Sequence, residues 1–245
     1  MAKVRISAII FLIIELFLYY LILTAGGDVL VYSSFFSIVG CFLYALFWGK
    51  DRLFIAGLAC TVGADFCLVV LSPVRRLWGM VFFLVAQSLY ALRLHRNRPN
   101  RTLLIARGVL SVLAILVTFL VLKRNTDWLS IISIYYYVNL IMNIIVSFTQ
   151  FRQNRLLPMG LVCFLLCDTV IGLQVAAGAY LPISEGNWLH DLIFMDFNLA
   201  WFFYLPSQIT LALTATKHAK AFPLGGRCPE GADEGYAAGF SKHFR

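Results

Sequence analysis

Residues 57–70 read GLACTVGADFCLVV, an apolar run with a single aspartate, Asp65, at its centre. The apolar character continues over about residues 53–71, and a helix that crosses a bilayer needs roughly 20 such residues. A carboxylate in the hydrocarbon region costs on the order of 2.5–3.5 kcal/mol on insertion scales, so it is expected to face a bundle interior or a cavity. This stretch therefore predicts a membrane helix that turns a functional group inward.

The rest of the chain has the same character. It has 245 residues, of which 61% are hydrophobic and only 13% charged, an apolar share well above that of a soluble globular domain. Eight apolar runs are long enough to cross a membrane. They cover residues 7–24, 28–48, 53–71, 76–94, 103–122, 128–149, 157–178 and 190–215. The sequence predicts an all-α membrane protein, a bundle of about eight transmembrane helices in one domain over residues 1–218.

Basic residues predict the orientation of this bundle. Most lie on one side of the predicted membrane: Lys3, Arg5, Lys50, Arg52, Arg96, Arg98, Arg101, Arg152, Arg155, Lys217 and Lys220. By the positive-inside rule both termini are expected in the cytoplasm, and we expect a bacterial plasma membrane. The net charge of +8 then reflects topology and attraction to anionic lipid headgroups, with no nucleic acid as partner. Residues 219–245 combine Pro, Gly and mixed charges without an apolar period, which predicts a disordered cytoplasmic tail.

A second aspartate repeats the pattern of the first. The segments GLACTVGAD (57–65) and GLVCFLLCD (160–168) share Gly, Leu, Cys and Asp at the same offsets, so Asp168 corresponds to Asp65. The two segments belong to the third and the seventh of the eight predicted helices. This correspondence favours two parallel four-helix repeats, related by an axis along the membrane normal.

Other polar side chains lie on single faces of the neighbouring predicted helices. Residues 76–94 carry Gln87 and Tyr90, residues 128–149 carry Tyr136, Asn139 and Asn143, and residues 190–215 carry Trp201, Tyr204 and Gln208. Asn and Gln in membrane helices usually make hydrogen bonds between helices, so each amide is either such a bond or part of a site. Glu15 is a further buried acid without a counterpart in the repeat, and we expect it to serve packing. Pro206 lacks a backbone donor, which predicts a kink with a freed carbonyl.

No metal site is expected from this sequence. His95, His190, His218 and His243 lie at the ends of predicted helices or in the tail, away from the cysteines inside the helices. The two aspartates instead suggest acid and base chemistry. If both face one cavity, repulsion between like charges lets one carry a proton while the other stays ionised. Such a pair can protonate a substrate and activate water, and a substrate reached inside a membrane is a lipid.

The order of these elements resembles the YhhN, or lysoplasmalogenase-like, family of multi-pass membrane proteins. GLACTVGAD is similar to that family's first aspartate helix, GMVFFLVAQSLY (79–90) to its Gly-x-x-Phe-x-x-Ala-His-x-x-Tyr helix, MGLVCFLLCDTVIGL (159–173) to its second aspartate helix, and WFFYLPSQITLAL (201–213) to its last helix with Tyr and Gln. Tyr135 and Met142 are also similar. Three positions depart from the pattern: Gln87 replaces a His, Ala64 a Gly and Cys167 a frequent Ser. Glutamine can donate and accept hydrogen bonds but cannot take up a proton.

The resemblance implies hydrolysis of the vinyl ether bond of a lysoplasmalogen to a fatty aldehyde and a glycerophospho-base. It marks Asp65 and Asp168 as the catalytic pair. The substrate-binding residues would be Gln87, Tyr90, Tyr136, Asn139, Tyr204 and Gln208. The partner would be a lysophospholipid of the membrane, and the reaction needs no cofactor. Two other functions stay open: a proton-coupled transporter or flippase, and a lipid-binding or non-catalytic membrane protein whose aspartates only join helices.

Overall fold

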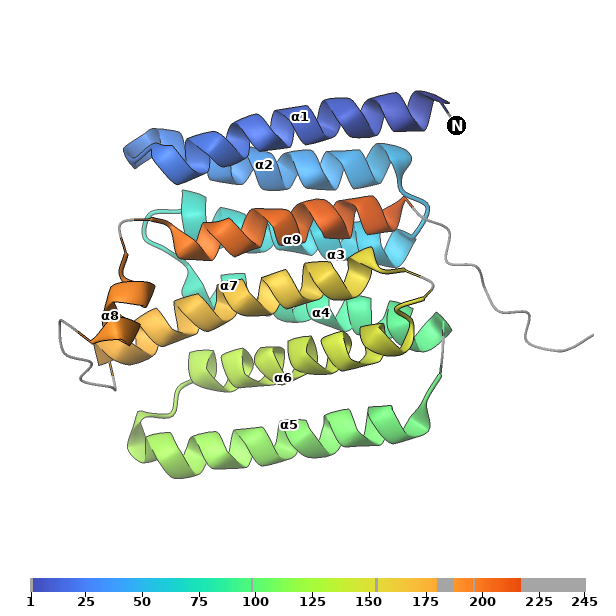
Figure 1. Ribbon diagram of the computed structural model, residues 1–245. Helices are drawn as coiled ribbons and strands as arrows, with labels where there is room; N and C mark the ends of the chain where they lie inside the picture. The colour runs from blue at the N-terminus through green and yellow to red at the C-terminus, as the bar shows by residue number, and fades with distance from the viewer. Residues whose placement is uncertain (1, 98, 153, 180–186, 196, 217–245) are drawn as a thin grey trace, which may run out of the picture.

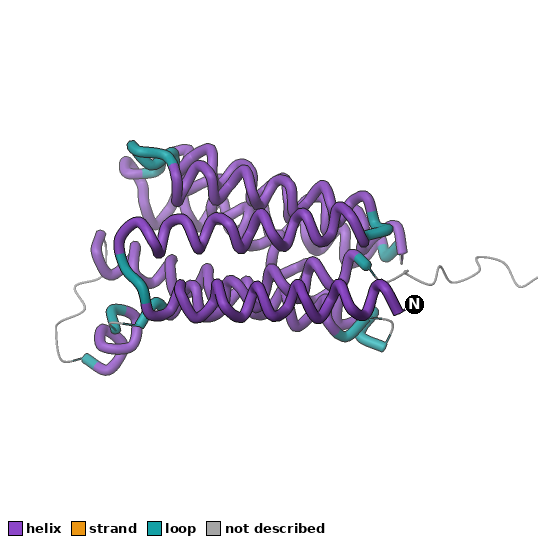
Figure 2. The backbone as a smooth tube through the Cα atoms, turned by 90° about the horizontal axis from the view of Figure 1, so that it is seen from above, coloured by secondary structure: helices purple, strands orange, loops and turns teal. Residues whose placement is uncertain are grey.

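The computed structural model describes residues 2–97, 99–152, 154–179, 187–195 and 197–216. Its helices, in chain order, are α1 (Ala2–Thr24), α2 (Gly27–Trp48), α3 (Arg52–Asp65), the π-helix η1 (Phe66–Val70), α4 (Arg76–Asn97), α5 (Arg101–Leu122), the 3-10 turn η2 (Lys123–Asn125), α6 (Trp128–Thr149), α7 (Leu156–Ala179), α8 (Trp188–Ile193) and α9 (Leu199–Ala215). The long helices run side by side along one direction (Figures 1 and 2). No strand occurs in the described residues.

The all-α membrane prediction is confirmed. Among the described residues, seven helices are long and apolar enough to cross a membrane, and α9 is a shorter apolar helix. The single helix predicted over residues 190–215 is wrong, because the chain forms α8, leaves the helix, and starts α9 at Leu199. The polar side chain of Asn198 caps the new helix by accepting from the Trp201 backbone N–H at 3.3 Å. The predicted tail, residues 219–245, lies outside the described residues.

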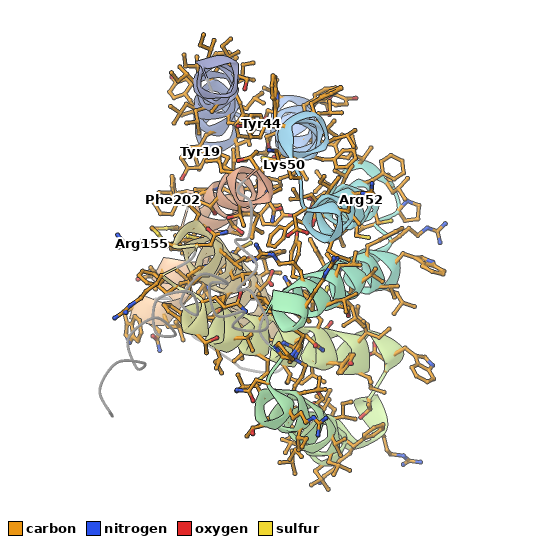
Figure 3. The ribbon with its side chains drawn as sticks, turned by 90° about the vertical axis from the view of Figure 1, so that its right-hand side faces the viewer. Tyr19, Tyr44, Lys50, Arg52, Arg155 and Phe202 are labelled. Atoms are coloured by element: carbon orange, nitrogen blue, oxygen red, sulfur yellow. The ribbon has the colours of Figure 1, made fainter. Side chains whose placement is uncertain are left out.

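The helices pack in a similar way in the two halves of the chain, as two parallel four-helix repeats would. The most extensive contacts join α3 to α4 in the first half and α7 to α9 in the second. If α4 corresponds to α9 and α2 to α6, the contact of α4 with α6 corresponds to that of α9 with α2. Seen end-on, α1 and α5 lie at opposite edges of the bundle (Figure 3), where equivalent helices of two repeats are expected. The aspartate helices α3 and α7 are thereby placed in the interior.

Tyr19 of α1 satisfies the backbone carbonyl that Pro206 leaves free. A proline at position 206 cannot donate to the carbonyl four residues earlier, that of Phe202. The hydroxyl of Tyr19 donates to this oxygen at 3.0 Å, and Figure 3 shows Tyr19 between α1 and α9, with Phe202 beside α9. The helix α9 continues through Pro206 to Ala215. This bond between helices therefore compensates for the proline.

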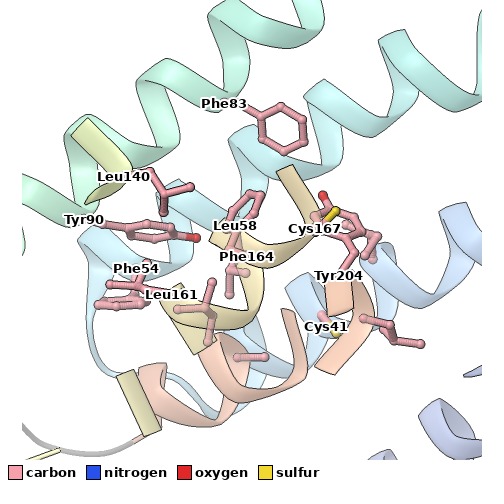
Figure 4. Packing of buried hydrophobic residues seen from close by; sticks show 14 of the residues in the cluster. Cys41, Phe54, Leu58, Phe83, Tyr90, Leu140, Leu161, Phe164, Cys167 and Tyr204 are labelled. Atoms are coloured by element: carbon pink, nitrogen blue, oxygen red, sulfur yellow. The ribbon is translucent and has the colours of Figure 1, made fainter. Parts of the chain in front are cut away.

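A buried ion pair anchors the start of α3. Asp51 caps this helix through the Phe54 N–H, and its other oxygen accepts from Arg93 Nε at 2.8 Å. The Arg93 side chain is 4% exposed, and its guanidinium lies 4.9 Å from the centre of the Phe54 ring. Phe54 in turn stacks on Tyr90 of α4 (Figure 4), with ring centres 4.7 Å apart. This cluster joins α3 and α4 at one end of the bundle.

Loss of this ion pair should destabilise the fold measurably. Asp51→Ala removes a helix cap and leaves Arg93 buried without its anion, for an expected cost of about 2–4 kcal/mol in the free energy of unfolding. The matched control is Asp127→Ala, since Asp127 caps α6 through Ser130 N at 2.8 Å. Asp127 is exposed and makes no ion pair in the described structure, so only the cap is lost, at about 1 kcal/mol. Thermal unfolding in detergent measures both, and equal losses would contradict the account.

Candidate active site

Asp65 is the last residue of α3 and directly precedes η1. Its side chain is 3% exposed, and its Oδ2 accepts a hydrogen bond from the Tyr204 hydroxyl of α9 at 2.6 Å. The wider π-helical turn that follows changes the direction of the next side chains, so that Leu68 and Val69 also face the site. Such π-turns are rare in proteins, and those that occur are frequently found at functional sites.

Asp168 lies in the middle of α7 and has its own tyrosine. The Tyr136 hydroxyl of α6 donates to Asp168 Oδ2. Asp168 is partly exposed, in contrast to Asp65. Each aspartate is therefore held by a tyrosine from a neighbouring helix, and the two side chains differ in how far they are buried.

Both aspartates line one cavity of about 120 Å³. Cys167 and Tyr204 also belong to its wall, and the remaining lining side chains are apolar: Leu68, Val69, Phe83, Ile171, Ala200 and Trp201. None of the lining residues is basic. One water needs only about 10–15 Å³ of such space, so the cavity can hold water together with a small part of a ligand. Because η1 and the first turn of α9 contribute to it, the cavity extends toward the end of the bundle away from the N-terminus (Figure 1).

Aromatic rings fix the tyrosines that hold the aspartates. The ring of Phe83 lies 6.0 Å from that of Tyr136 and 6.3 Å from that of Tyr204, measured between centres. Phe164 packs against both Phe83 and Tyr204, at 5.6 and 5.5 Å (Figure 4). Both phenylalanines are buried, so the tyrosines have little freedom to turn away from the carboxylates. The site is preorganised on rigid helices.

Of the six predicted substrate-binding residues only Tyr204 lines the cavity, although Tyr136 still bonds Asp168. Gln87 and Asn139 belong to a separate hydrogen-bonded group around Arg107 of α5. Tyr90 stacks on Phe54 in the core, and Gln208 is fully buried in α9. In the described structure neither polar atom of the Gln208 side chain has a hydrogen-bond partner. The structure thus brings together Asp65, Asp168, Tyr136 and Tyr204, and their roles in substrate binding and catalysis remain predictions.

The sequence pattern does not predict that Phe83 and Cys167 line the cavity. Phe83 follows Phe82 in α4, and the apolar pattern does not distinguish which of the two faces inward. The change of direction at η1 has no signal in a single sequence, so the pattern does not predict that Leu68 and Val69 face the cavity either. Trp201 could be found, since it shares a helix face with Tyr204 at a spacing of three.

Comparison with known proteins identifies the family. The family model described as the YhhN family matches residues 29–215, which include most of α2, all of α3 to α9 and both aspartates. No curated protein and no solved structure matches the chain. The matched segment covers most of the 245 residues and agrees with the resemblance seen in the helix motifs. The chain is therefore a membrane protein of the YhhN family.

Proposed function

We propose that this protein is a membrane-embedded hydrolase of the lysoplasmalogenase type, which cleaves the vinyl ether bond of a lysophospholipid to a fatty aldehyde and a glycerophospho-base. The observation that supports this most is the pairing of Asp65 and Asp168 in one cavity, since an enol ether needs one acid and one base. The apolar wall of Phe83, Ile171 and Trp201 suits the alkenyl chain beside the reacting bond.

The proposed reaction begins with transfer of a proton from Asp65 to the β-carbon of the vinyl ether, which leaves an oxocarbenium ion. Asp168, the more exposed carboxylate, orients a water, which adds to the cationic carbon while Asp168 takes its proton. The product is a hemiacetal. Asp168 then returns this proton to the glycerol oxygen as the C–O bond breaks, and Asp65 takes the hemiacetal hydroxyl proton. Aldehyde and alcohol are formed, and both aspartates are back in their starting states.

The tyrosines keep the two carboxyls in position for these transfers. Tyr204→Phe and Tyr136→Phe each remove one hydroxyl without changing the ring packing around Phe83. We expect kcat to fall about tenfold in either variant, because a misplaced acid or base lowers the efficiency of proton transfer. The value of KM should change little. The control is Tyr137→Phe, whose hydroxyl bonds Thr169 outside the cavity wall. Equal activity of all three variants would show that the tyrosines do not position the reaction.

The substrate assignment is tested with a matched pair of lysophospholipids. The purified protein receives a lysoplasmalogen or its saturated alkyl ether analogue, and aldehyde release is followed. Turnover of the vinyl ether alone supports the proposal, since a saturated ether has no carbon that can be protonated to an oxocarbenium ion. If neither compound reacts, pH-dependent lipid uptake into vesicles of the same protein would instead favour the proton-coupled transporter.

A further inference from the structure

The hairpin of α4 and α5 carries a concentration of positive charge that the proposed reaction does not use. Between Asp65 and Asp127 the sequence contains no acidic residue. The same segment includes Arg96 and Arg101 at the α4–α5 connection and Arg107 one and a half turns into α5. Arg93 of this hairpin is neutralised by Asp51. The other arginines have no such partner in the described structure, which points to an anion from outside the chain.

Arg107 is the most constrained of these cations. It is 8% exposed, and its two terminal nitrogens donate to Asn139 Oδ1 at 3.1 Å and to Asn143 Oδ1 at 2.7 Å on α6. Asn143 is itself fixed by two bonds of 2.8 Å to Gln87 on α4. These amides orient the guanidinium but leave its charge uncompensated, and a guanidinium in a protein stays protonated. A buried charge without a counter-ion is costly, so one is expected to bind nearby.

Further donors lie beside this guanidinium. In the described part of the chain, Arg107 Nε has no hydrogen-bond partner, and neither has the hydroxyl of Ser111 one turn further along α5. His95 Nε2 on α4 also lacks one, and His95 lies within electrostatic range of Arg107. Ser111 is 5% exposed. The helices α4 and α5 both pack on α6 and make little contact with each other. These donors therefore come from two helices that lie on either side of α6 (Figure 1).

We propose that Arg107, Ser111 and His95 form a binding site for the phosphate group of an anionic phospholipid, and we call these three residues the phosphate cluster. Arg107 lies six residues from the start of α5, about 9 Å along its axis, a depth from which an arginine reaches the lipid headgroups. Guanidinium and phosphate form strong charge-assisted hydrogen bonds. Basic sites between helices at one membrane face are typical of such headgroup binding.

The phosphate cluster is distinct from the aspartate cavity. On α6, Asn143 lies seven residues from Tyr136, about 10 Å along the helix axis, and none of the three residues lines the cavity. The bound lipid would therefore hold α4, α5 and α6 together rather than react. The proposal does not depend on the hydrolase reaction, and its test measures binding and stability alone.

The test compares lipids of different charge by native mass spectrometry and thermal unfolding of the detergent-solubilised full chain. Phosphatidylglycerol should bind wild type at least about tenfold more tightly than phosphatidylcholine and raise the unfolding midpoint, because both lipids carry the phosphate but phosphatidylcholine also brings a cationic choline, which the guanidinium repels. In Arg107→Gln this preference should disappear. Arg124→Gln is the matched control, because Arg124 is exposed at the other end of α5. Equal affinities of wild type for both lipids, or an unchanged preference in Arg107→Gln, would overturn the proposal.

Two further measurements identify the source of the phosphate and keep the proposal testable if Arg107→Gln does not fold. Glycerol 3-phosphate should not reproduce the midpoint shift at equal concentration, and a full shift with this soluble compound would refute the lipid assignment. If Arg107→Gln does not fold, Ser111→Ala and His95→Gln decide. Each should weaken phosphatidylglycerol binding several-fold and leave phosphatidylcholine unchanged, and a lack of effect in both would refute the site.

Discussion

Asp65→Asn and Asp168→Asn should each abolish aldehyde release while the protein remains folded. General acid or base catalysis contributes about 10²–10⁴-fold to a rate, and an amide can neither give nor take the required proton. The fold should tolerate both changes, because the Asn oxygen still accepts the hydroxyl of Tyr204 or Tyr136. Catalytic carboxylates are often kept at a cost in stability, so the unfolding midpoint should stay equal or rise. Initial rates in detergent and thermal unfolding measure the two effects.

Glu15→Gln is the matched control for these variants. Glu15 is also a buried acid, 1% exposed, but it lies against Gly40 between α1 and α2 and does not line the cavity. Its variant should keep a rate close to that of wild type. A comparable loss in all three variants would mean that buried acids serve the fold in general. Full activity of either aspartate variant would remove that residue from the proposed mechanism.

Gly57→Ala should lower the stability of the fold more than the corresponding change at Gly160 or Gly172. A Cβ at position 57 would fall on the ring of Tyr90, closer than two carbon atoms approach in real structures. Tyr90 is fully buried and stacked on Phe54, so its ring cannot move aside. Overpacking of this kind costs about 1–3 kcal/mol, more than the roughly 0.5–1 kcal/mol that replacing a helical glycine by alanine gains. Thermal unfolding and the yield of folded protein measure the effect.

The repeat provides graded controls for this prediction. At Gly160, the counterpart of Gly57, a Cβ would lie 2.5 Å from Thr210 Oγ1 and 3.3 Å from Leu211, and the threonine side chain can turn away. At Gly172 nothing lies within 4 Å. The expected order of midpoints is Gly57→Ala lowest, then Gly160→Ala, with Gly172→Ala at or above wild type. An unaffected Gly57→Ala would contradict the close approach of α3 and α4.

Hydrophobic length and the pattern around Asp65 were sufficient to predict the class of fold and most helices. The predicted run 128–149 coincides with α6, for example, because Asp127 supplies a cap directly before the apolar residues. The correspondence of Gly57 and Gly160 also appears in the packing, since both glycines admit the helix that follows in their half of the chain. Length alone could not reveal the break before α9, because Phe194 and Met195 are as apolar as a membrane helix requires.

The arrangement of the site was only partly accessible from the sequence. The aspartates and their stripe of polar neighbours could be recognised, but which neighbour meets which carboxylate depends on how the helices rotate about their axes. Tyr136 and Tyr204 turn toward the aspartates, whereas Asn139 accepts from Arg107 and Gln87 accepts from Asn143. The π-turn at Phe66–Val70 redirects Leu68 and Val69, and no periodicity argument anticipates such a change.

The central claim is that Asp65, paired with Asp168 in the cavity, protonates the β-carbon of the vinyl ether. The most direct measurement is mass spectrometry of the aldehyde that purified wild type releases from lysoplasmalogen in D₂O. The account predicts release of an aldehyde with deuterium at the carbon next to the carbonyl, since that carbon receives its proton from Asp65. No aldehyde from a well-folded wild type, or an aldehyde without this deuterium, would contradict the account.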